Sequence, residues 1–293
     1  MSANSLLAVR SRSGNIRLAN TRSRLRPGVA FGGGDLYVAF RRLLIALGLL
    51  LALSAVAGEQ VRVGAYHFPP YVVKPESAAP GGVLPELLAV LNALQRDYQF
   101  TLVPTSVTRR YRDLEHGRFD LILFESPEWG WQDTAHGALD LHVEDAEVYV
   151  ALAKPGRDQG YFEQLKGKRL ALYNGYHYGF AGFNANQRFL REHFSAVLTY
   201  SHDSNLLMLM RDRVDIAVIP RSYLQSYQRR HPERSKALLV SQRVDQYYQH
   251  HALFRPQSPL TPEMFAALLL VLNRHGQLDA LLQRYHLVVP VND

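Results

Sequence analysis

The side chains best suited to hold a small molecule stand just after apolar stretches of strand length. Glu125 follows Phe119–Phe124, and a carboxylate in a cleft can receive a cationic group or, if burial raises its pKa, act as a general acid or base. Aromatic rings would offer flat apolar faces to a solute. We therefore predict a solute with a flat or apolar body and a cationic group near Glu125. The predicted ligand-binding residues are Phe68, Tyr71, Glu125, Ser126, Trp129, Tyr176, His177 and Arg221.

Each of these assignments competes with a purely structural explanation. Glu125 can equally be a solvated or capping glutamate, and Trp129 and Trp131 can simply pack beneath their loop. The adjacent pair Arg109-Arg110 could reach an anion, but arginines that open a short helix are usually solvated, and we expect that here. The sequence leaves these alternatives open.

Metal and cofactor chemistry find no support in the sequence. His177 and the pair His250-His251 are metal ligands by type, but no two histidines stand four residues apart beside a carboxylate. A glycine-rich phosphate loop and a nucleophile elbow are both missing from the sequence. We predict no metal, no cofactor and no catalytic residue.

Strands that alternate with helices must position the site. Val61–Ala65 alternates apolar and polar residues as a strand does, and Pro69-Pro70 ends it, so the neighbouring aromatic residues lie on a stiff loop. Apolar positions on one face predict a helix over Val83–Leu94, and the run Phe119–Phe124 predicts a central strand covered on both faces. This alternation favours a mostly parallel sheet, in which ligands collect at the carboxyl ends of the strands.

The same order of elements returns in the second half, although the two halves are not a sequence repeat. A crossing strand at Val148–Ala153 leads to strands at Arg169–Tyr173 and Val214–Ile219, and Tyr247–Phe254 is the predicted return crossing. The expected helix caps are Thr108, Ser204 and Thr261, and one further helix is expected through Phe180, Phe183, Phe189 and Leu190.

The N-terminal segment has the form of a secretory signal. Arg41-Arg42 precede the apolar run Leu43–Val56, and Ala55-Val56-Ala57 is a small-x-small cleavage site. The run is too short to span a membrane as a helix. We therefore predict a signal peptide over residues 38–57 with cleavage after Ala57, a periplasmic mature protein and no membrane span in the mature chain. Residues 1–37 lack periodicity, and we expect them to be untranslated or disordered.

The distribution of charge excludes nucleic acid as a partner. The formal net charge is +7, but residues 1–57 hold eight of the 33 basic residues and one of the 26 acidic ones. The remaining chain is therefore balanced at 25 of each, whereas a nucleic-acid-binding protein needs a basic surface for the phosphate backbone. The chain has no cysteine, which excludes disulfides and a lipid-modified cysteine.

Five short motifs follow one another along the mature chain. They are Phe68-Pro69-Pro70-Tyr71; Gly82 with Glu86-Leu87; Leu114-x-x-Gly117-x-Phe119-Asp120-Leu121-Ile122; Leu165-x-Gly167-Lys168; and Leu272-Asn273-x-x-Gly276-x-Leu278 through Tyr285. In this order they resemble extracellular solute-binding proteins of family 3, which serve polar amino-acid ABC transporters. The similarity covers residues 60–288. It implies the type II periplasmic-binding-protein fold, an α/β fold of two lobes, each a mostly parallel sheet flanked by helices.

The resemblance also implies a way of working, in which two lobes close on a ligand. It places lobe 1 at residues 60–148 with 253–290 and lobe 2 at 149–252, with hinges near Glu147–Ala153 and Tyr247–Phe254. The implied function is that of a periplasmic solute-binding protein for a small polar or aromatic solute. Its partner would be an inner-membrane ABC permease or a sensor, and we expect a monomer.

The predicted site departs from the pattern of the family. Amino-acid binders carry a Ser/Thr pair after the central strand and then an arginine that holds the ligand carboxylate. Here the strand ends in Phe124-Glu125-Ser126, and Glu128–Asp133 contains no arginine. The family acid that binds the α-amino group falls at Pro220, beside Arg221. We therefore expect the standard α-amino acids to bind weakly or not at all.

Two further functions stay open beside the non-enzymatic receptor that we predict. Cyclohexadienyl dehydratases resemble this family and use a carboxylic acid to expel water, a role that Glu125 could take. Their substrate is a dicarboxylate, however, so the missing arginine counts against this activity. The other alternative is an orphan binding domain that acts through protein contacts.

Overall fold

The computed structural model describes residues 38, 40–42 and 58–287. The chain forms two units, Met1–Ala55 and Val56–Asp293, and in the first of them residues 38 and 40–42 are helical and exposed. The rest of the expected signal peptide, residues 1–37 and the last residues of the expected lobe 1 lie outside the described part. None of the helices in the described part has the length and hydropathy needed to cross a membrane.

One eight-stranded sheet runs through the second unit in the order β2-β1-β3-β8-β4-β7-β5-β6. β1 pairs in parallel with β2 and β3, and β5 pairs in parallel with β6 and β7. The long strands β4 and β8 are antiparallel to each other and join these two parallel groups. The strands are β1 (Glu59–Ala65), β2 (Tyr98–Pro104), β3 (Leu121–Glu125), β4 (Gly137–Leu152), β5 (Leu170–Tyr173), β6 (Ala196–Thr199), β7 (Ile216–Pro220) and β8 (Leu238–Phe254).

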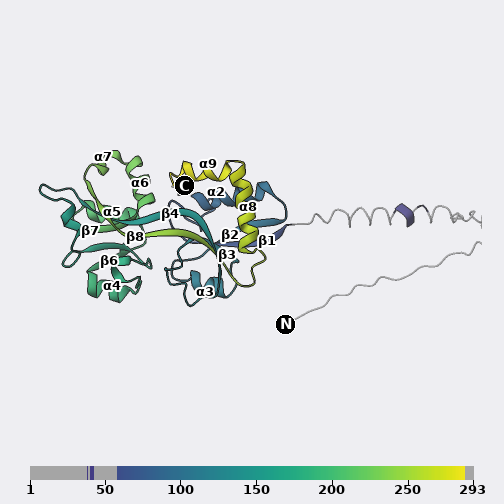
Figure 1. Ribbon diagram of the computed structural model, residues 1–293, viewed down its shortest axis with the longest axis horizontal. Coiled ribbons are helices and arrows are strands. Elements are labelled where there is room, and N and C mark those ends of the chain that lie inside the picture. Colours follow the sequence, from purple (N-terminus) through teal and green to yellow (C-terminus); the bar gives the residue numbers. More distant parts are fainter. Residues whose placement is uncertain (1–37, 39, 43–57, 288–293) are drawn as a thin grey trace, which may run out of the picture. The chain divides into compact units, whose positions relative to one another are not determined.

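Helices flank each parallel group. α2, α8 and α9 pack near β1–β3, while α4, α5 and α6 pack near β5–β7 (Figure 1). The helices are α2 (Val83–Leu94), α3 (Arg110–Glu115), α4 (Gln187–Phe194), α5 (His202–Met210), α6 (Arg221–Arg230), α7 (Pro232–Ser235), α8 (Pro262–Arg274) and α9 (Gln277–Arg284), with 3₁₀ turns η1 (Gln159–Phe162) and η2 (Gly179–Ala181).

This arrangement confirms the predicted fold class, two lobes that are each a mostly parallel sheet flanked by helices. We refer to the group around β1–β3 as lobe 1 and to the group around β5–β7 as lobe 2. β4 and β8 pass through both. The lobe boundaries expected from the sequence therefore stay a prediction.

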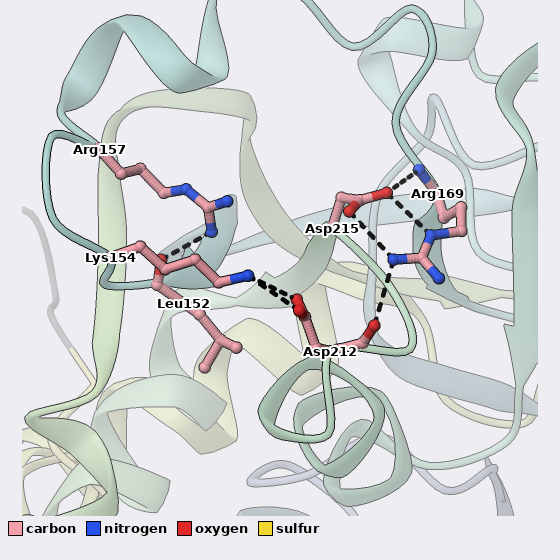
Figure 2. Close-up of polar contacts among 6 residues, drawn as sticks. All are labelled: Leu152, Lys154, Arg157, Arg169, Asp212 and Asp215. Atoms are coloured by element: carbon pink, nitrogen blue, oxygen red, sulfur yellow. Dashed lines mark hydrogen bonds and ion pairs between the residues drawn. The ribbon is translucent and has the colours of Figure 1, made fainter.

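Each lobe contains an ion pair of the same kind, in which an arginine binds an aspartate that directly precedes a central strand. In lobe 1 the backbone N–H, Nε and Nη2 of Arg62 donate to the carboxylate of Asp120 at 2.8–3.0 Å. In lobe 2 the same three groups of Arg169 donate to Asp215 at 2.7–3.1 Å (Figure 2). Such bidentate charge-assisted bonds fix β1 against β3 and β5 against β7. Both strand pairs thereby present their carboxyl ends in a defined register.

The joining strands are longer than expected. The predicted crossings at Val148–Ala153 and Tyr247–Phe254 are only parts of β4 and β8. The ladder between them shifts register between Asp140 and Val143, where His142 has a φ of 53°. A bulge of this kind interrupts the period of two, so the sequence pattern underestimates the strand.

Most of the other local predictions are confirmed, and three more are wrong. The helix over Val83–Leu94 and the Thr261 cap are as expected. Ser201, and not Ser204, caps α5, because its side chain accepts from the Ser204 N–H. Thr108 does not cap α3, which starts after Arg109 without a side-chain cap. The helix expected through Phe180 and Leu190 is instead a 3₁₀ turn followed by α4, since Gly182 and Phe183 both have positive φ.

Candidate ligand site

The carboxyl ends of β1, β3 and β5 converge with α3 and β4 on one enclosed cavity. Its volume is about 10 Å³, the space of roughly one water molecule. Four residues predicted from the sequence line it together with three that were not predicted. The lining residues are Tyr66, Phe68, Arg110, Trp129, Glu147, Tyr176 and His177.

A buried ion pair lies beside the cavity, and of its two residues Arg110 lines the cavity whereas Glu125 does not. Nε of Arg110 lies 3.1 Å from the carboxylate of Glu125, and Trp131 Nε1 donates to the same carboxylate at 2.9 Å. Neither charged side chain is more than 2% exposed. Burial raises the pKa of the Glu125 carboxyl, although the charge of Arg110 opposes this rise. The negative charge of Glu125 is thus compensated within the protein.

Arg110 is the clearest departure from the sequence-based expectation that Arg109 and Arg110 are both solvated. Arg109 is exposed, but Arg110 is 1% exposed. The Arg110 guanidinium donates to the backbone carbonyls of Val107 and Trp129 and lies 4.4 Å from the centre of the Tyr111 ring. A guanidinium with hydrogen bonds, an ion pair and an aromatic face can be buried at tolerable cost.

Glu147 brings a second buried carboxyl to the cavity, from the middle of β4. It is 2% exposed, and its Oε2 has no hydrogen-bond partner within residues 58–287. Burial raises its pKa well above the ordinary value, and the nearby carboxylates of Asp145 and Asp245 raise it further. The sequence carries a signal for this group, because Asp145 and Glu147 stand two residues apart on a strand and therefore point to the same side.

Asp145 and Asp245, in contrast, are well provided with donors. Asp145 accepts from the Tyr71 hydroxyl at 2.9 Å and from the hydroxyl and backbone N–H of Ser222 at 2.5 and 3.1 Å. Asp245 accepts from the Tyr149 hydroxyl and from two backbone N–H groups of η2. Because Tyr71 belongs to lobe 1 and Ser222 to lobe 2, Asp145 ties both lobes to β4.

Aromatic side chains fill the space around the cavity. Phe68 contacts Tyr71, Trp129 and Tyr176 with ring centroids 4.9, 6.0 and 5.7 Å apart. His250 lies against Phe68 and Tyr71, and burial lowers its pKa to about 3, so this histidine is neutral at ordinary pH. These contacts explain why so little volume is left in this cavity.

The two lobes approach each other closely at glycines. Gly175 has a φ of 84°, and a Cβ there would lie 2.7 Å from Val107 Cγ1 of lobe 1. Gln246 of β8 adds a polar bridge, since its amide accepts from Trp129 Nε1 at 3.2 Å and donates to the carbonyl of His177. The structure is therefore that of a closed arrangement.

His177 and Tyr176 contribute polar atoms that nothing in the described chain satisfies. The Tyr176 hydroxyl and His177 Nδ1 are buried without hydrogen-bond partners among residues 58–287. Burial, and then the charge of Arg110, lower the pKa of His177 to about 4. The imidazole is therefore neutral and can donate from one nitrogen and accept at the other.

The remaining predicted residues lie apart from the cavity. Ser126 is buried, and its hydroxyl accepts from the backbone N–H of Glu128 at 3.4 Å. Arg221 starts α6 and places its guanidinium 5.1 Å from the centre of the Tyr247 ring. Neither lines the cavity. Sequence reasoning did not select Tyr66, Arg110 or Glu147, of which Glu147 alone carried a readable signal.

Comparison with known proteins supports the fold. A family model described as "ABC transporter, phosphonate, periplasmic substrate-binding protein" matches residues 90–288. A histidine kinase sensor domain with similarity to periplasmic binding proteins is 18% identical, with a TM-score of 0.61 over 80% of this chain and 99% of that one.

Two further structures are similar over comparable lengths. One is an ABC uptake transporter substrate-binding protein from Streptococcus pneumoniae with bound histidine, at 17% identity and a TM-score of 0.62 over 78% of this chain and 92% of that one. The other is an ancestral amino-acid-binding protein, a precursor of cyclohexadienyl dehydratase, at 17% identity and a TM-score of 0.57 over 77% and 94%. No curated protein sequence matches. At these identities the structures show the fold alone, which is the type II periplasmic-binding fold expected from the sequence.

Proposed function

We propose that this chain, which belongs to the family of periplasmic substrate-binding proteins of phosphonate ABC transporters, is a receptor whose lobes close on a small solute. We further propose, from the residues around its cavity, that this solute carries a cationic group. Membership of the amino-acid-binding family 3 is part of the same proposal, and the fold-level likeness to amino-acid-binding proteins supports it.

One observation carries this proposal. Three buried polar atoms without partners in the described chain belong to residues that line the same cavity, namely Glu147 Oε2, Tyr176 Oη and His177 Nδ1. A buried polar group without a partner costs about 1–3 kcal/mol. A solute that hydrogen-bonds to these atoms removes that cost, and therefore binds in preference to one that does not.

The charges around Glu147 favour a cation. The carboxyl of Glu147 has Asp145 and Asp245 as charged neighbours, and no cation raises or lowers its pKa appreciably. A cationic group placed at Glu147 would therefore meet an excess of carboxyl groups. We assign it to Glu147 in place of Glu125, because Glu125 already has Arg110 as its partner.

Solute entry requires movement. A cavity of about 10 Å³ holds no solute of amino-acid size, so the lobes must separate, or the aromatic side chains must move, before binding. Phe68, Trp129 and Tyr176 would then hold the flat or apolar body of the solute. The family implies an ABC permease as partner, and the likeness to a kinase sensor domain supports a sensor as the alternative.

The test begins with the solute itself. The purified protein is denatured, and the released small molecules are identified by mass spectrometry. A thermal-shift panel then compares small amines, their neutral alcohol counterparts and the twenty amino acids. At a hundredfold excess over Kd a ligand stabilises the protein by about 2.7 kcal/mol. We expect amines to stabilise it and the standard amino acids to do little, because Arg110 is not free for a carboxylate.

Variants of two glutamates on one strand make the test specific. Glu147→Gln should remove the stabilisation by amines, whereas Glu144→Gln should leave it intact, because Glu144 binds Gln249 outside the cavity. Amines that stabilise both variants equally would refute the assignment of Glu147.

A second candidate function rests on the small cavity volume. A binding domain that acts through protein contacts needs no solute, and a cleft filled by its own aromatic side chains fits that role. A permease or sensor fragment that binds the protein equally well with and without any copurified solute would favour it. A dehydratase activity has only the fold-level likeness in its favour, and a turnover assay with prephenate tests it.

A further inference from the structure

A second pocket, far larger than the aromatic cavity, opens beside it. Its volume is about 400 Å³, within the range of roughly 300–1,000 Å³ that is common for small-molecule sites. One wall comes from lobe 1, from the loop His67–Lys74 and from Tyr285. The other comes from lobe 2, from the start of α5 and one side of α6. None of the ligand-binding residues predicted from the sequence lines it.

The charged side chains that line this second pocket include more cations than carboxylates. Lys74 lines it from lobe 1 and Arg230 from lobe 2, and neither has an ion-pair partner in the described ranges of the chain. The carboxylate that lines it belongs to Asp203, which accepts from the Tyr223 hydroxyl at 2.6 Å. Two cations against one carboxylate leave a net charge of one positive unit, which suits a monoanion.

Uncharged donors also face the second pocket. His202 is 2% exposed, and both of its ring nitrogens lack partners within residues 58–287. It begins the nine-residue helix α5, whose positive end lies here and is capped by Ser201, which accepts from the Ser204 N–H. His67 accepts from the backbone N–H of Lys74 at Nδ1, 3.1 Å, so its neutral ring carries a proton on Nε2.

Aromatic rings border the second pocket on both sides. Tyr223 and His202 lie with ring centroids 4.9 Å apart, and Tyr285 lines the opposite wall with its hydroxyl bound to Glu86 at 2.6 Å. His202 also contacts Tyr176 of the aromatic cavity, with centroids 5.5 Å apart. The two sites are thus neighbours through one histidine.

We propose that this second pocket binds a small aromatic carboxylate, with its carboxylate between Lys74 and Arg230 and its ring near Tyr223 and Tyr285. Both lobes contribute a cation, so the bound anion favours the closed arrangement. The proposal goes beyond the proposed function, because it assigns an anion to a different pocket and uses none of the residues of the aromatic cavity.

Benzoate is the probe, measured by isothermal titration against the full chain, with benzamide as the uncharged compound of matched shape. We expect benzoate to bind and benzamide not to bind. Arg230→Gln and Lys74→Gln should each weaken benzoate binding by about tenfold or more. Arg229→Gln is the matched control, since Arg229 is the next residue on α6 and does not line the pocket.

The expected results separate this proposal from the receptor function. Glu147→Gln should leave the affinity for benzoate unchanged, whatever its effect on the binding of amines. The proposal is overturned if benzoate does not bind at millimolar concentration, if benzamide binds equally well, or if the Arg230 and Arg229 variants behave alike. Arg230 is exposed, so loss of folding is not expected, and circular dichroism of each variant confirms that.

Discussion

Replacing Glu147 by glutamine should stabilise the protein at neutral pH and leave its stability near pH 4.5 almost unchanged. The carboxyl is 2% exposed, and burial together with Asp145 and Asp245 raises its pKa well above the ordinary value of 4.5. Below pH 4.5 the carboxyl is protonated in both the folded and the unfolded chain. Above it the unfolded chain loses the proton first, so the free energy of unfolding falls until the pH passes the folded pKa.

The magnitude follows from this linkage. The slope is about 1.4 kcal/mol per pH unit, so a range of about three units lowers the free energy of unfolding by at most about 4 kcal/mol. Glutamine does not titrate, although its amide also needs partners in the cavity, which reduces the expected gain to roughly 1–3 kcal/mol. Urea unfolding measures this gain in the free energy of unfolding. The wild type, Glu147→Gln and the control Glu144→Gln are compared at several pH values from 4.5 to neutrality.

Two outcomes of this experiment are distinct. If the Glu147→Gln variant gains stability over the wild type as the pH rises, the carboxyl is held protonated by its surroundings. If the free energies of unfolding of the two proteins stay parallel over the whole range, Glu147 is ionised in the folded protein. The reasoning that burial without a partner keeps this carboxyl protonated is then refuted.

Three further predictions test the ion pair, the approach of the lobes and the leader. Arg110→Leu leaves Glu125 without its partner and should lower the free energy of unfolding by about 3–5 kcal/mol. The control Arg109→Leu should change the free energy of unfolding by less than about 0.5 kcal/mol. Equal urea midpoints for the two variants would contradict this prediction. Gly175→Ala should increase the radius of gyration in solution scattering, because its Cβ would clash across the lobes, whereas Gly167→Ala, with a similar φ but open space, should not. Mass spectrometry of the secreted protein should find Gly58 at its N-terminus, and a retained leader would contradict the periplasmic prediction.

Local sequence patterns were sufficient for most of the elements. Alternation predicted β1, one-faced apolar spacing predicted α2, and Thr261 marked the start of α8. These signals are local, because a strand or a helix end is decided by residues a few positions apart. Where a bulge or a residue with positive φ intervened, as in β4 and after η2, the local pattern was interrupted and the prediction was wrong.

The candidate site was only partly open to the same reasoning. Phe68, Trp129, Tyr176 and His177 could be selected because they follow strands, and the carboxyl ends of parallel strands meet. Their role in ligand binding stays a prediction. Arg110 could not be selected, because nothing in its neighbourhood along the chain distinguishes it from the exposed Arg109.

The sequence by itself determined the alternation and order of the strands and helices and the balanced charge of residues 58–293, which depend on short-range periodicity and composition. The two-lobed fold followed from the resemblance of its motifs to those of solute-binding proteins. The tertiary structure alone decided which polar groups are paired. It joined Arg110 to Glu125, gave Asp145 the hydroxyls of Tyr71 and Ser222, and left Oε2 of Glu147 without a partner among residues 58–287. The physical reason is that the pairing and the pKa of a buried group depend on side chains brought together by long-range packing, and no local pattern in the sequence records that packing.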